Sequence, residues 1–84
     1  MEQFETGMMA RSQSGHDAGK VYVITKVEEA YVYLVDGKVR TLDKPKKKKK
    51  KHVQLIKESF DIQGITDVDI KRWIEIWNKE DNQN

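Results

Sequence analysis

The chain contains no cysteine, which excludes disulfides and thiol chemistry and fits a reducing compartment such as the cytoplasm. It also has no long hydrophobic run: the apolar stretch Tyr31–Val35 is far shorter than the about 20 residues that a membrane span needs. Glu2 and Glu5 stand where a signal peptide would carry lysines, so we expect no export signal and no targeting leader.

The short length and polar composition limit the size of the core. With 84 residues, the chain has room for one domain. A domain this small buries only about 60% of its unfolded surface. Because 37% of the residues are hydrophobic and 36% are charged, we expect a thin core and a large solvated surface.

Positive charge is concentrated in one segment. Residues 38–52 carry nine basic groups and one acid, a net charge of +8. Residues 1–37 carry three basic and six acidic groups, and residues 53–84 carry four and seven, so each flank has a net charge of −3. The basic segment therefore has acidic flanks, which indicates one directed surface for a polyanion.

Short runs rich in β-branched and aromatic residues predict a mainly β fold. We expect four such strands, at Met8–Ser12, Val21–Thr25, Tyr31–Val35 and His52–Ile56. Gly15 and Gly19 lie in the turn between the first two, where they permit unusual backbone angles. Four or five short strands with tight turns favour a small barrel.

Asp36-Gly37 predicts a tight hairpin. This dipeptide tolerates the positive φ angles of a two-residue type I′ turn. We therefore expect Lys38–Leu42 to pair with the strand that ends at Val35, with Val39 facing the core and its basic neighbours facing outward.

The C-terminal part changes to helical periodicity. A linker at 57–66 leads to a predicted amphipathic helix over 67–79 and then to an expected disordered tail at 80–84. Thr66 and Asp69 have the spacing of a capping box. The apolar stripe of Ile70, Trp73, Ile74 and Trp77 predicts that the helix packs on the barrel; the alternative is an exposed surface for a partner.

Six consecutive lysines, Lys46–Lys51, are the most distinctive feature of the chain. In a regular strand every second lysine would point inward, where an unpaired ammonium group is very costly. We therefore expect a loop, an edge or a flexible arm, preceded by Lys44 and Pro45. About six phosphate contacts would give a log–log salt slope of roughly −4 to −5, a loss of affinity of about a thousandfold between 50 and 200 mM salt. The alternative is a charge run that only promotes solubility.

Other side chains give weaker signals. Tyr31 and Tyr33 share a strand face and could stack on unpaired bases, or could simply be half-buried packing residues. His16 and His52, the only imidazoles, fit no metal-ligand pattern. There is no nucleophile elbow, phosphate-binding loop or plausible carboxylate pair, so we expect neither catalysis, nor a bound metal, nor a cofactor.

Two segments together resemble the KOW family of RNA-binding proteins. "FETGMMARSQSGHDAG" followed by "KVYVI" is similar to the KOW motif, with Gly-x-Asp-x-Gly in a turn between apolar strands. "YVYLVDGKVRTLDKPKKKKKKHVQ" is similar to the continuation in small bacterial KOW proteins and, through them, in KOW proteins of the archaeal and eukaryotic large ribosomal subunit. The resemblance covers roughly residues 4–56 and implies an SH3-like barrel over 1–56 that includes the lysine-rich segment 44–51.

The resemblance also implies where RNA would bind. The family's RNA-facing turn falls on Gly15, His16, Asp17, Gly19 and Lys20. Its basic hairpin and tail fall on Lys38, Arg40, Lys44, Lys46, Lys47, Lys48, Lys49, Lys50 and Lys51. The turn has fewer basic residues than is usual in the family, which moves the expected RNA contact to the lysine run.

Three functions remain open at this point. The first is non-catalytic binding of RNA, with ribosomal RNA or the ribosome as the expected partner. The second is an SH3-like protein-interaction module that uses the aromatic residues and the C-terminal helix. The third is reversible attachment to an anionic membrane surface, where each lysine contributes about 1 kcal/mol.

Overall fold

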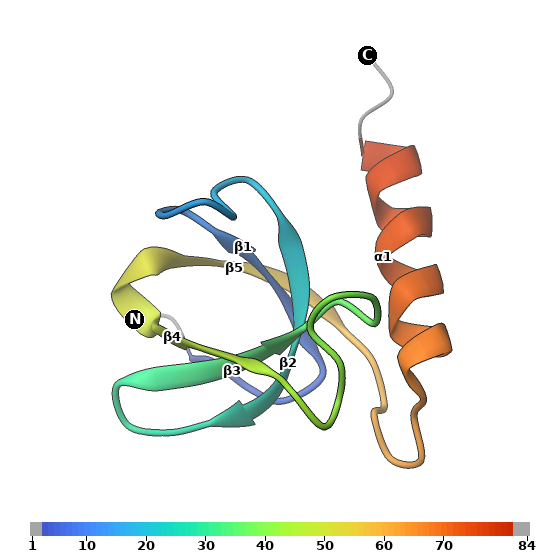
Figure 1. Ribbon diagram of the computed structural model, residues 1–84, viewed down its shortest axis with the longest axis horizontal. Helices are drawn as coiled ribbons and strands as arrows, with labels where there is room; N and C mark the ends of the chain where they lie inside the picture. The colour runs from blue at the N-terminus through green and yellow to red at the C-terminus, as the bar shows by residue number, and fades with distance from the viewer. Residues whose placement is uncertain (1–2, 82–84) are drawn as a thin grey trace.

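A computed structural model describes residues 3–81, and it is mainly β with one C-terminal helix. Five strands form one antiparallel sheet in the order β4-β3-β2-β1-β5 (Figure 1). The elements are β1 Met8–Ser12, β2 Val21–Val27, β3 Tyr31–Val35, β4 Lys46–Lys49, the 3₁₀ turn η1 Lys50–His52, β5 Val53–Ser59 and α1 Asp67–Asp81. The predicted fold class is thus confirmed, and β1 and β3 have the predicted bounds.

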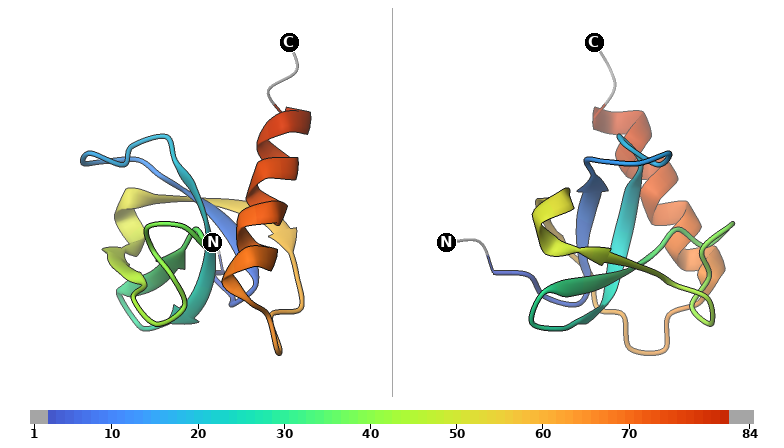
Figure 2. Two further views of the ribbon diagram at one scale, coloured as in Figure 1. Left: turned by 45° about the vertical axis from the view of Figure 1, so that its right-hand side comes forward. Right: turned by 60° about the vertical axis from the view of Figure 1, so that its left-hand side comes forward.

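The sheet curls on itself because its two edge strands follow each other in the chain. Only the three residues of η1 separate β4 from β5, so the two edges approach each other as in an SH3-like barrel (Figures 1 and 2). Within residues 3–81 no ladder joins β4 to β5, so the barrel is open there. Gly15 and Gly19 both have positive φ, as the turn between β1 and β2 was predicted to require.

Apolar side chains form two cores, one on each face of the sheet. The inner core contains Ala10, Tyr22, Ile24, Val32, Leu34, Val53 and Leu55. The outer core lies under α1 and contains Met9, Val21, Val23, Val35, Ile70 and Ile74. Successive residues of β2 point to alternate faces, so this one strand contributes to both cores.

The helix α1 begins at Asp67, as predicted, and lies against one side of the sheet (Figure 2). The capping box is present: the Thr66 backbone N–H donates to the Asp69 carboxylate, and the Asp69 N–H donates to the Thr66 hydroxyl. Trp73 and Trp77 pack against the outer core, as the docking interpretation predicted. The helix continues to Asp81, so the prediction of disorder is wrong for residues 80 and 81, while 82–84 lie outside the described residues.

The predicted hairpin at Asp36-Gly37 is wrong. A type I′ turn needs a positive φ at both central residues, here Asp36 and Gly37. Gly37 has a positive φ, but no non-glycine residue in the described chain does, so Asp36 does not meet this requirement. The Asp36 carboxylate instead accepts hydrogen bonds from the backbone N–H groups of Lys38 and Arg40, and this closes an irregular loop. Lys38–Leu42 is therefore not a strand, and Val39 is 78% exposed instead of facing the core.

The loop over residues 36–45 packs against the beginning of α1. The Leu42 N–H donates to the Asp67 carboxylate at 2.8 Å. A Cβ added to Gly37 would lie 2.2 Å from the Asp67 carbonyl oxygen, so only glycine allows this close approach.

The linker predicted at 57–66 is too long, because β5 runs to Ser59 and its last residue pairs with Met8.

Candidate functional site

The lysine run forms a regular edge strand. β4 pairs along its length with β3, and its other edge has no ladder partner among residues 3–81. Lys46 lies opposite Leu34 and Lys48 opposite Val32, two residues of the inner core. Because paired residues share a sheet face, these two lysines point toward the barrel interior. Lys47 and Lys49 point outward.

Asp17 makes this inward orientation possible. Its side chain is 8% exposed and forms ion pairs with Lys46 Nζ at 3.0 Å and Lys48 Nζ at 3.1 Å. Lys48 Nζ also donates to the Ser14 carbonyl oxygen at 2.8 Å. The two inward lysines are therefore neutralised in part by a single carboxylate from the β1–β2 loop, which they hold against β4.

Two hydroxyl groups complete the coordination of Asp17. Ser12 Oγ donates to Oδ1 at 2.9 Å and the Tyr22 hydroxyl donates to Oδ2 at 3.2 Å. Burial alone would raise the pKa of Asp17, but the hydrogen bonds from Lys46 and Lys48 outweigh it and hold that pKa well below its ordinary value. Burial, together with the negative charge of Asp17, raises the pKa of Tyr22 to about 12. At neutral pH Asp17 is therefore ionised and Tyr22 is protonated.

On the outer face, Lys47 covers the two tyrosines that were predicted to stack on bases. Its Nζ lies 4.5 Å from the Tyr31 ring centroid and 5.9 Å from that of Tyr33. Glu28 pairs with Lys47 at 3.7 Å and accepts a hydrogen bond from the Tyr33 hydroxyl at 3.2 Å. An incoming base must therefore displace an ammonium group from the Tyr31 ring.

The remaining lysines of the run are available to a ligand. Lys49 and Lys51 are exposed, and Lys50 is half-buried with its Nζ 5.5 Å from the Phe4 ring centroid. Within the described part of the chain, none of these three forms an ion pair. Lys44, just before the strand, is exposed as well.

The β1–β2 loop carries the predicted turn residues and lies beside the lysine run. The Gln13 N–H donates to the His52 carbonyl oxygen at 2.9 Å, which ties the start of the loop to η1. A Cβ added to Gly15 would lie 3.7 Å from Lys48 Nζ, and His16 is exposed. The structure thus brings Gly15 and Asp17 of the predicted turn together with the lysine run, whereas Gly19 lines a different groove.

Lys20 and Lys38 lie elsewhere, in a groove of about 470 Å³ beside α1. Arg11 and Lys71 line the same groove, together with Asp36 and Glu75. Arg40 is half-buried, and its backbone N–H and carbonyl are used within the 36–45 loop. Apart from Arg40 and Lys44, which lie on the 36–45 loop, the predicted basic residues divide between two surfaces: β4–η1 and this basic groove.

Sequence reasoning missed the structural role of Asp17 and the contribution of Arg11 and Lys71 to the basic groove. Asp17 had a detectable signal: it is the one acid in the loop that precedes β2, and a lysine strand needs a counter-charge on its inner face. The positions of Arg11 and Lys71 had none, because only the docking of α1 brings them together.

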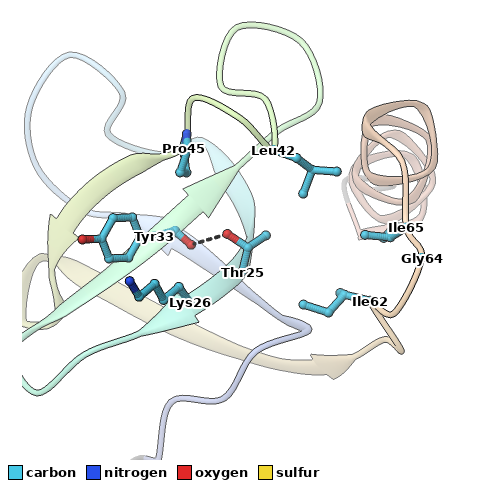
Figure 3. A pocket seen from close by; sticks show the side chains of 8 residues that line it. All are labelled: Thr25, Lys26, Tyr33, Leu42, Pro45, Ile62, Gly64 and Ile65. Atoms are coloured by element: carbon cyan, nitrogen blue, oxygen red, sulfur yellow. Dashed lines mark hydrogen bonds between the residues drawn. The ribbon is translucent and has the colours of Figure 1, made fainter.

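Another groove, of about 520 Å³, lies between the sheet and the segment before α1 (Figure 3). Leu42, Ile62 and Ile65 line its helix side, while Tyr33 and Lys26 come from the sheet. Lys26 is the one charged residue among its lining residues, and Thr25 and Tyr33 add polar groups to the apolar side chains.

Two further findings concern the described residues. No three His, Asp or Glu side chains in residues 3–81 gather closely enough to hold a metal ion. The helix of the same region is too short and too polar to cross a membrane.

Comparisons with known proteins leave the sequence without an assigned family: no family model matches the chain, and no curated protein matches it. The resemblance to the KOW family therefore stays a prediction that rests on the two segments quoted above.

Proposed function

We propose that this protein binds structured RNA without catalysing a reaction, and that it does so through the lysines of β4 and η1. The observation that carries the proposal is the fixed lysine edge: six consecutive lysines occupy an ordered strand and turn, and only two of them are held by the buried carboxylate of Asp17. A rigid cationic edge of this kind suits the phosphate backbone of a folded RNA.

The pairing with Asp17 reduces the number of lysines that can release counterions from RNA. Four lysines of the run remain: Lys49, Lys50 and Lys51, which have no ion pair among the described residues, and Lys47, whose exposed pair with Glu28 is weak enough to be exchanged for a phosphate. About four phosphate contacts give a log–log salt slope of about −3 to −4. Affinity should then fall about a hundredfold between 50 and 200 mM salt, less than six free lysines would produce.

Lysine ammonium groups supply charge but little base reading, so recognition depends on the shape of the RNA. The KOW resemblance supports ribosomal RNA as the partner, with the protein associated with the ribosome in the cytoplasm. The β1–β2 loop, tied to η1 through Gln13 and His52, lies where it can contact the same RNA as the lysine edge.

The test compares two variants that remove the same charge. Lys49→Gln/Lys51→Gln changes the lysine edge, whereas Lys57→Gln/Lys79→Gln changes two exposed lysines on β5 and α1. Binding to a fluorescent RNA hairpin is followed by anisotropy from about 50 to about 200 mM salt. In the edge variant the slope of log affinity against log salt concentration should be less negative by about 2, and in the control variant by much less.

Equal loss in both variants would mean that net charge alone drives association, and would overturn the proposed site. Absence of hairpin binding by the unmodified protein, even at low salt, would overturn the proposed function. Lys46 and Lys48 are kept in both variants, because replacing them would leave the buried Asp17 carboxylate without its counter-charges.

A further inference from the structure

A small aromatic groove lies on the molecule between the end of β5 and the C-terminal part of α1. Its volume is about 210 Å³. Sites for cofactors and drug-sized ligands measure about 300–1,000 Å³, so this groove suits a single side chain. It is lined by Glu58, Phe60, Trp73, Ile76, Trp77 and Glu80. We infer that the groove, defined by these six residues, binds a lysine or arginine side chain from a basic segment of a partner protein.

The aromatic walls suit the aliphatic stem and the charge of such a side chain. Phe60 and Trp73 are stacked, with ring centroids 4.1 Å apart and an interplanar angle of 20°, which makes a firm apolar wall. Trp77 already attracts a cation within the protein, because the Arg11 guanidinium lies 5.3 Å from its ring centroid. Ile76 is 48% exposed, so this wall still offers apolar surface to a ligand.

Charge complementarity decides which ligand enters. The two charged residues that line the groove, Glu58 and Glu80, are both acids. Glu80 lies in the last turn of α1, where the partial negative charge of the helix terminus adds to that of the carboxylates. The groove therefore attracts a cation and repels a phosphate, unlike the basic groove that Arg11, Lys20, Lys38 and Lys71 line.

The tryptophans of the groove can report ligand binding by fluorescence. Trp73 and Trp77 are the only tryptophans in the chain, and both line it. The full chain is titrated, without RNA, with a capped Ala-Arg-Ala-Lys-Ala peptide and with a capped Ala-Gln-Ala-Gln-Ala peptide. Tryptophan fluorescence should show a saturable change with the cationic peptide, weakened as ionic strength rises from about 0.05 to 1 M, and none with the neutral peptide.

Two matched variants test the carboxylates. Glu58→Gln/Glu80→Gln should weaken binding of the cationic peptide by about tenfold, which corresponds to about 1.4 kcal/mol. Glu29→Gln/Glu75→Gln removes the same charge from exposed residues outside the groove and should leave binding almost unchanged. If circular dichroism shows that the first double variant is unfolded, Glu58→Gln and Glu80→Gln are measured singly.

The inference would be overturned by no saturable change with the cationic peptide, by equal binding of the neutral peptide, or by equal effects of the two double variants. A second copy of the chain is the rival occupant. Self-association in sedimentation velocity that both Glu58→Gln/Glu80→Gln and Lys49→Gln/Lys51→Gln abolish would identify that occupant and overturn the partner-protein version. RNA is absent from these measurements, so their failure leaves the proposed RNA binding untouched.

Discussion

Asp17 connects the chemistry of the lysine edge with the stability of the fold. Its carboxylate receives hydrogen bonds from Ser12 and Tyr22 and ion pairs from Lys46 and Lys48. Removing one partner of a buried ion pair costs more than the pair itself contributes, because the remaining charge is left without compensation. This residue should therefore be sensitive even to a substitution that preserves its shape.

Asp17→Asn should lower the free energy of unfolding by about 2–4 kcal/mol. The asparagine carbonyl oxygen can still accept from one of the two hydroxyls, but the neutral amide leaves two inward ammonium groups unpaired, and the Lys48 side chain is only 10% exposed. Urea denaturation measures the change. Asp43→Asn is the control, because Asp43 is exposed and bonds only to the nearby Thr41 hydroxyl. Equal stability of the two variants would show that Asp17 has no such role.

The stabilisation by Asp17 should disappear in acid. The pKa of Asp17 in the folded protein lies below its ordinary value of 3.8, so its contribution is complete above that value and declines as pH falls. The difference in unfolding free energy between the unmodified protein and Asp17→Asn should be constant from pH 7 to about 5 and should shrink toward pH 2. Denaturation series at each pH measure it, and a difference that stays constant down to pH 2 would contradict the assignment.

At the scale of single elements, local patterns predicted the elements that local chemistry determines. The bounds of β1 and β3 and the start of α1 follow from alternation and from the Thr66–Asp69 capping box. The prediction for the lysine run was incomplete, although an edge was among the expected possibilities. The sequence pattern alone leaves the inward lysines of a regular strand unpaired, but Asp17, distant in the chain, supplies the missing counter-charge.

The hairpin prediction at Asp36-Gly37 failed for a related reason. Hairpin statistics weigh only the two turn residues and their flanks, whereas here the Asp36 carboxylate satisfies the backbone and Gly37 packs on α1. Neither the packing of the 36–45 loop on the helix nor the basic groove beside α1 has a sequence signal, because both depend on where the helix docks. The strand that pairs with β3 is therefore the lysine run, beyond the loop.

Gly37→Ala should detach the 36–45 loop from α1. Alanine at a φ of +82° costs about 1–2 kcal/mol, and its Cβ would lie 2.2 Å from the Asp67 carbonyl oxygen, so the total loss should reach about 2–4 kcal/mol. Gly64→Ala is the matched control: Gly64 has a φ of +74° and no atom within 4 Å of the added Cβ. Thermal or urea denaturation compares them, and equal losses would show that the loop contact contributes nothing.

At the scale of the whole molecule, β2 makes the barrel and the helix one cooperative unit. Val21 and Val23 pack under α1, while Tyr22 and Ile24 pack inside the barrel. A small domain has little core to spare, so neither core should survive the loss of the other. The RNA-binding edge proposed on β4 therefore depends on a helix that packs elsewhere on the outer face of the sheet, over β2.

Ile70→Ala tests this dependence. Ile70 belongs to α1 and is fully buried in the outer core, so its truncation should cost about 2–5 kcal/mol. Ile76→Ala, at a residue 48% exposed, should cost less than about 1 kcal/mol. In urea, tryptophan fluorescence reports the helix side, and the amide resonance of Leu34 reports the inner core. The unfolding midpoints reported by both signals should shift together to a lower urea concentration, since the two cores share β2. A Leu34 transition that stays in place while the tryptophan transition moves would mean that the barrel folds without its helix, and RNA binding would then also survive the substitution.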